Sequence, residues 1–169
     1  KGRLLAALFA PWLLCVIGMA TPILTATYSL GTTQIYKRYV TERVYFFKTC
    51  TDMNLGILGK MSTCAGGNPG GKGATAMLFA LGFSVIHGIN ILTQMCTYRK
   101  KCCFLTTGFG CGLLSFSFIF VALFKTDLEK PSLGTTQLGL GYDYGGGFFA
   151  LVISSLLSIG TYVFLHKKG

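Results

Sequence analysis

Four long apolar runs constrain what this chain can fold into. They cover about residues 4–25, 74–95, 104–124 and 145–165. A hydrocarbon core of about 30 Å is crossed by roughly 20 helical residues, and a helix satisfies its own backbone hydrogen bonds where water is absent. With 51% hydrophobic and 12% charged residues, a soluble chain of 169 residues would have too little polar surface. We therefore expect a single all-α membrane domain, a bundle of four transmembrane helices.

Short basic segments predict the orientation of this bundle. They lie before the first run, between the second and third, and after the fourth: Lys1, Arg3, Arg99, Lys100, Lys101, Lys167 and Lys168. The positive-inside rule assigns these segments and both termini to the inner side. Two outer loops then cover about residues 26–73 and 125–144. The plasma membrane is the expected location, and an organellar inner membrane is the alternative.

The net charge of +10 raises the question of nucleic acid binding. The basic inner ends of the helices account for much of this charge, however, and they suit anionic lipid, where each charge contributes on the order of 1 kcal/mol. We expect the lipid bilayer as a partner and no nucleic acid.

The first outer loop is expected to form a small antiparallel β-sheet. Residues 25–30, 34–40 and 43–49 are rich in β-branched and aromatic side chains, with breaks at Gly31 and at the pair Thr41 and Glu42. Such a sheet is marginally stable alone. A disulfide between Cys50 and Cys64 on the outer side would add roughly 3 kcal/mol by the chain-entropy model. In a reducing compartment the same residues would be two thiols.

Two local motifs carry a family resemblance. One is the run Tyr45-Phe46-Phe47-Lys48-Thr49-Cys50, followed by Cys64, which looks like a Gly-Leu-Trp-x-x-Cys motif and its second Cys. The other is residues 144–153, which look like a Tyr-Gly-x-Gly-Phe pattern at the start of the last helix. With four helices, a long first outer loop and a short second one, almost the whole chain resembles the claudin-like tetraspans, a superfamily that includes claudins, peripheral myelin protein and amastins. The local similarity is strongest to amastins.

The resemblance implies a role for one aromatic residue. Phe47 stands where the family has Trp, and the only Trp of the chain, Trp12, lies in the first apolar run. An aromatic ring at Phe47 is expected to fill an apolar slot between the sheet and the tops of the helices, without the N–H donor of an indole.

Three cysteines flank the inner basic turn: Cys96, Cys102 and Cys103. Cysteines next to a membrane are candidates for S-palmitoylation, and the alternative is three plain thiols. No metal site is expected, since this segment supplies no other ligand type.

Two polar residues, His87 and Asn90, fall at membrane depth in the second run. An unsatisfied polar group there is costly and marks a functional suspect. The simpler hypothesis is hydrogen bonding to serines of other helices, such as Ser115, Ser117 or Ser154, and the alternative is a ligand or proton role.

The sequence favours a non-enzymatic protein. All five acidic residues fall in the expected outer loops, and no nucleophile elbow, zinc-helix motif or dinucleotide fingerprint is present. No catalytic residue and no cofactor are therefore expected.

Two functions remain. In the first, claudin- or amastin-like copies self-associate or organise membrane contacts through an exposed edge of the outer sheet. Six basic residues of the first outer loop would then favour anions along any enclosed path: Lys37, Arg38, Arg43, Lys48, Lys60 and Lys72. In the second, the chain is a structural accessory subunit of a large respiratory or photosynthetic membrane complex, in contact with other membrane proteins.

Overall fold

The structure is a computed structural model of the chain. It describes residues 2–33, 36–56, 59–67, 71–96, 100–129 and 141–167, and within these ranges it leaves out the side chains of 30–33, 36–38 and 100–102.

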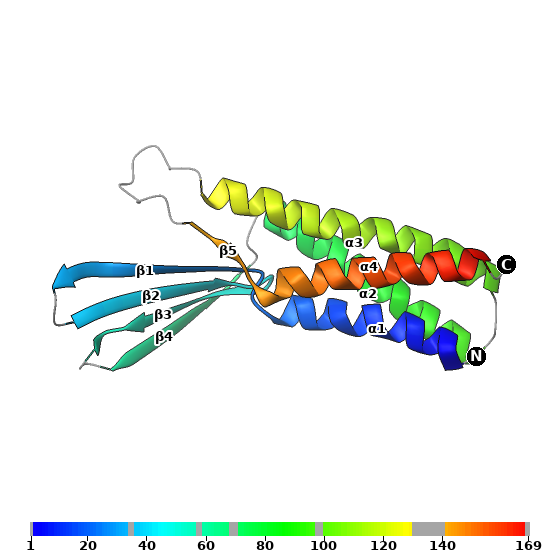
Figure 1. The fold of residues 1–169 in the computed structure, drawn as a ribbon, viewed down its shortest axis with the longest axis horizontal. Coiled ribbons are helices and arrows are strands. Elements are labelled where there is room, and N and C mark those ends of the chain that lie inside the picture. The colour runs from blue at the N-terminus through cyan, green and yellow to red at the C-terminus, as the bar shows by residue number, and fades with distance from the viewer. Residues whose placement is uncertain are drawn as a thin grey trace.

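Four helices form one bundle, and a sheet extends from one end of it (Figure 1). The helices are α1 (Gly2–Ala20), α2 (Gly71–Cys96), α3 (Lys100–Leu128) and α4 (Gly146–Lys167). Each is long and apolar enough to cross a membrane, which agrees with the four predicted runs. α1 packs on α2 and α4, and α3 packs on α2 and α4, so α2 and α4 are diagonal partners. Both termini lie at the end of the bundle opposite the sheet.

The first helix is shorter than predicted. It ends at Ala20, whereas the apolar run continues to about residue 25. Pro22 has no backbone N–H to donate and disfavours helical geometry in the residue before it, so the helix stops there. The apolar residues that follow belong to a strand instead.

The sheet has five antiparallel strands in the order β4-β3-β2-β1-β5. They are β1 (Leu24–Thr33), β2 (Tyr36–Val44), β3 (Lys48–Asn54), β4 (Lys60–Gly66) and β5 (Asp143–Tyr144). β5 comes from the second outer loop and pairs with Leu24 and Thr25 of β1.

The predicted strand boundaries need correction. Thr41 and Glu42 lie inside β2, paired with β1 on one side and β3 on the other, and so do not break a strand. The break falls instead within the predicted strand 43–49, at the turn between β2 and β3. β-Propensity shows that strands form, but pairing with neighbours decides where they end.

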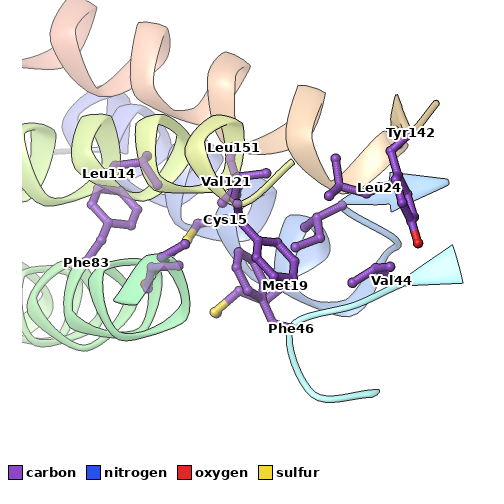
Figure 2. Close-up of a cluster of buried hydrophobic side chains, with 14 of the residues drawn as sticks. Cys15, Met19, Leu24, Val44, Phe46, Phe83, Leu114, Val121, Tyr142 and Leu151 are labelled. Carbon is purple, nitrogen blue, oxygen red and sulfur yellow. Dashed lines mark hydrogen bonds between the residues drawn. The ribbon is translucent and has the colours of Figure 1, made fainter. Parts of the chain in front are cut away.

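One apolar core joins the base of the sheet to the bundle (Figure 2). Leu24 and Val44 from the sheet, Met19 from α1 and Phe46 from the β2–β3 turn are all buried in it. The sheet is therefore packed on the membrane domain rather than tethered to it.

Candidate functional site

The edge strand β4 is the most accessible part of the outer sheet. All seven of its residues are exposed, and it is the last strand in the sheet order. At the opposite edge, β5 covers only the first two residues of β1 among the residues that the structure describes. An edge strand presents a row of backbone donors and acceptors to a further strand.

A disulfide holds β4 on the sheet. Cys50 of β3 and Cys64 of β4 are directly opposite each other, with Cα atoms 4.1 Å apart, and their sulfurs are bonded. The predicted pairing of these two cysteines is confirmed. Its position ties the exposed edge to the buried part of the sheet, because Cys50 is buried while Cys64 is exposed.

A polar network crosses one face of the sheet. The carboxylate of Asp52 lies 3.0 Å from the guanidinium of Arg43 and accepts a hydrogen bond of 2.6 Å from the hydroxyl of Ser62. It therefore links β2, β3 and β4. Further along the same face, the hydroxyls of Thr27 and Thr41 are 3.4 Å apart.

The predicted basic residues are partly neutralised. Arg43 pairs with Asp52, and the ammonium of Lys72 lies 2.7 Å from the carboxylate of Asp127, in the last turn of α3. Lys48 lies over the ring of Tyr45, and Lys60 is exposed in β4. The side chains of the two others, Lys37 and Arg38, lie outside the described residues. The ion pairs weaken the argument for a path that favours anions.

The second outer loop is attached through Tyr142, a residue that sequence reasoning missed. Its hydroxyl donates to Glu42 of β2 at 3.0 Å, and its backbone N–H donates to Glu129 at 3.0 Å. Glu129 in turn pairs with Lys125 of α3 at 2.9 Å. A sequence signal existed in the alternation of aromatic and polar residues just before α4, but a stretch this short does not identify its partners.

These contacts shift two pKa values. Burial, and then the neighbouring charge of Glu42, raise the pKa of Tyr142. The hydrogen bond from Lys125, and then that from the N–H of Tyr142, lower the pKa of Glu129. The tyrosine is therefore held neutral and the glutamate ionised, as these hydrogen bonds require.

The aromatic slot between sheet and helices is filled by Phe46 and not by Phe47. Phe46 is fully buried, whereas the side chain of Phe47 is 51% exposed. Both residues lie in the turn between β2 and β3, and the ring of Phe46 is the one that belongs to the apolar core. The residue that stands in the position of the family's Trp thus has a different environment from the one predicted.

The inner cysteines differ in their accessibility. Cys96 is exposed at the end of α2, as acylation requires. Cys103 is buried against Leu4 and Leu8, so its assignment as an acylation site is corrected to a packing role. The side chain of Cys102 lies outside the described residues.

Within the described residues, neither His87 nor Asn90 is hydrogen bonded to one of the three predicted serines. Asn90 accepts a hydrogen bond of 2.6 Å from Thr106 of α3. The three serines form bonds elsewhere: Ser117 with the carbonyl of Ala76, Ser154 with that of Pro11, and Ser115 with Ser155. Neither ring nitrogen of His87 has a hydrogen-bond partner among the described residues.

Within the described part of the chain, no group of three or more His, Cys, Asp or Glu side chains could hold a metal ion. No protein-family model and no curated protein matches the chain. The claudin-like resemblance thus remains a prediction.

Proposed function

We propose that the chain is a non-enzymatic integral membrane protein of the claudin-like tetraspan type that self-associates side by side in one membrane. The partner of the exposed edge strand β4 is then the β1 edge of a second copy. The exposure of all seven residues of β4 at the end of the sheet carries this proposal.

The direction of the strands favours this pair of edges. The strands extend along the long axis of the bundle (Figure 1), so copies in one membrane hold their sheets upright and in the same sense. In the order β4-β3-β2-β1 each strand is antiparallel to its neighbours, so β4 and β1 run in opposite directions. Pairing β4 of one copy with β1 of the next thus continues an antiparallel sheet, whereas β4 with β4 would be parallel.

The depth of the copies in the membrane sets the register of this contact. Across the sheet, Thr27 of β1 lies in the same row as Ser62 of β4. Two copies at equal depth bring these residues opposite each other, and Lys60 then faces the uncharged Ser29. No like charges meet, and the contact repeats from copy to copy because it joins two different surfaces.

Disulfide trapping tests the proposal. Copies carrying Ser62→Cys and copies carrying Thr27→Cys are co-expressed and oxidised from outside with a membrane-impermeant oxidant. We expect a cross-linked dimer only when both variants are present. The matched control combines Ser62→Cys with Ser29→Cys, which lies about 7 Å further along β1 and should cross-link weakly.

Two results would overturn the proposal. A dimer formed by Ser62→Cys alone would indicate symmetric pairing of β4 with β4. If native mass spectrometry of the gently extracted protein finds a fixed stoichiometry with unrelated subunits and no self-association, the chain is an accessory subunit instead. The plasma membrane, with β4 in an oxidising space, is the proposed location, since the Cys50–Cys64 disulfide suits it.

A further inference from the structure

The buried face of α2 turns polar in the inner half of the bundle. His87, Asn90 and Gln94 are three and four residues apart, so they lie on one side of the helix, and each is at most 4% exposed. This row begins near the middle of α2 and leads to its inner end at Cys96. Polar side chains are costly at such depth unless they are hydrogen bonded.

The diagonal helix α4 places a second polar group near the same level. Two contacts align α3 with α4: Gly108 of α3 lies against Tyr162 of α4, and Ser115 of α3 is hydrogen bonded to Ser155 of α4. Ser158, which is between Ser155 and Tyr162, therefore lies opposite the part of α3 between Gly108 and Ser115. Gly110 of that same segment contacts His87: a Cβ on Gly110 would lie 3.1 Å from Nδ1. Because α2 and α4 are diagonal in the bundle, His87 and Ser158 approach its centre from opposite sides. Both lie opposite the same segment of α3, so their levels along the bundle differ by no more than about one helical turn.

Several polar atoms at this level have no hydrogen-bond partner among the described residues. They are both ring nitrogens of His87, Nδ2 of Asn90 and Oγ of Ser158. His87 and Ser158 are fully buried and Asn90 is 4% exposed. A buried water takes two to four such partners, and donors and acceptors are both present in this set.

The core changes character on the outer side of His87. Phe83, one turn away on α2, packs with Leu114 of α3 and Leu151 of α4 in the apolar core, and all three are fully buried (Figure 2). On the inner side, two more polar residues are buried, Thr107 of α3 and Thr161 of α4, and the hydroxyl of Thr161 donates to the carbonyl of Ala7 in α1. We propose that the inner half of the bundle binds a column of water, which enters at the inner end, terminates at His87 and is closed from outside by this apolar layer.

Solid-state NMR of the full chain in lipid bilayers tests this site. The protein is labelled at His and Trp and carries His166→Gln, so that His87 is the one remaining histidine. Trp12 is the internal control, because its indole N–H lies at a similar depth but donates to the carbonyl of Ser84 at 3.0 Å. We expect magnetisation from water to reach the ring of His87 several-fold faster than the indole of Trp12. Equal rates would show a dry site and overturn the proposal.

Three variants locate the water. Ser158→Ala removes a proposed partner, and Gln94→Leu makes the inner half apolar; both should slow the transfer to His87. Ser117→Ala is the matched control, since Ser117 is also fully buried but bonds Ala76 in the outer half. If Ser117→Ala slows the transfer as much as Ser158→Ala does, the site is not where we place it. If Gln94→Leu leaves the transfer unchanged, entry from the inner end is excluded.

Discussion

Gly147 of α4 lies directly against Gly18 of α1, backbone to backbone. A Cβ on Gly147 would be 2.6 Å from the carbonyl oxygen of Gly18. The N–H of Gly147 also donates to Pro22 at 2.9 Å, and that of Gly145 donates to Ile23 at 2.9 Å. These contacts hold the start of α4 on the end of α1, at the point where β1 leaves the bundle. Small residues allow such close approach of membrane helices.

Substitution of Gly147 by Ala is expected to destabilise the protein by about 1–3 kcal/mol, because the added methyl group meets backbone atoms that can move only if the helices separate. The matched control is Gly146→Ala, since a Cβ at Gly146 meets nothing within 4 Å. Unfolding in mixed micelles would measure both. Equal losses for the two variants would contradict the contact.

Phe46 and Phe47 allow a matched comparison between a buried and an exposed phenylalanine ring. Phe46→Ala should cost about 3–5 kcal/mol, because it leaves a cavity in the core that joins sheet and bundle. Phe47→Ala, at a ring that is half exposed, should change the free energy of unfolding little. Thermal unfolding of the two variants gives the comparison, and a larger loss at Phe47 would mean that the rings are assigned to the wrong sides.

Removal of the disulfide should loosen the edge of the sheet. The bond closes a loop with a sequence separation of 14, and by the chain-entropy model its loss costs roughly 3 kcal/mol. In the double variant Cys50→Ala, Cys64→Ala we expect faster deuterium exchange in residues 60–66. Cys96→Ala, at the opposite end of the bundle, serves as the control and should leave this exchange unchanged.

Alkaline pH should weaken the attachment of the second outer loop. The pKa of Tyr142 is raised in the folded protein from its ordinary value of 10.0, so its stabilising contribution is complete below pH 10. Above that pH the unfolded chain releases the proton first, and stability falls. Tyr142→Phe should lose about 1–2 kcal/mol at neutral pH, through the hydrogen bond to Glu42, and should show a smaller alkaline loss.

Unfolding free energies measured between pH 7 and pH 11 test this linkage. Tyr39→Phe, at a side chain that is 40% exposed, is the control and should leave the stability at neutral pH unchanged. Parallel pH profiles for the wild type and Tyr142→Phe would show that Tyr142 contributes nothing to the alkaline loss.

Local sequence preference predicted part of the outer sheet. The β-branched and aromatic composition of the first outer loop indicated strands, and two cysteines within the same expected loop indicated their disulfide. It did not predict β5, because two residues carry no periodicity and form a strand only when β1 is beside them. Glu42 was predicted to be part of a break between strands. It lies inside β2 because β1 and β3 pair with it on both sides, and its carboxylate accepts a hydrogen bond from Tyr142, which is 100 residues away.

Rotation of the helices decided the intramembrane contacts. His87 and Asn90 were recognisable as polar residues at membrane depth, but the choice of Thr106 over any serine as the partner of Asn90 depends on how α2 and α3 pack. Cys103 shows the same limit, since its burial against Leu4 depends on contact with α1.

The sequence by itself determined that the chain has four helices long enough to cross a membrane, because apolar length is a property of each segment alone. The inner location of the short basic segments stays a prediction of the positive-inside rule. Only the tertiary structure decided that Phe46 is buried, that Gly147 meets Gly18 and that β4 is the exposed edge. Each of these depends on register and rotation between segments distant in the chain, which local composition leaves undetermined.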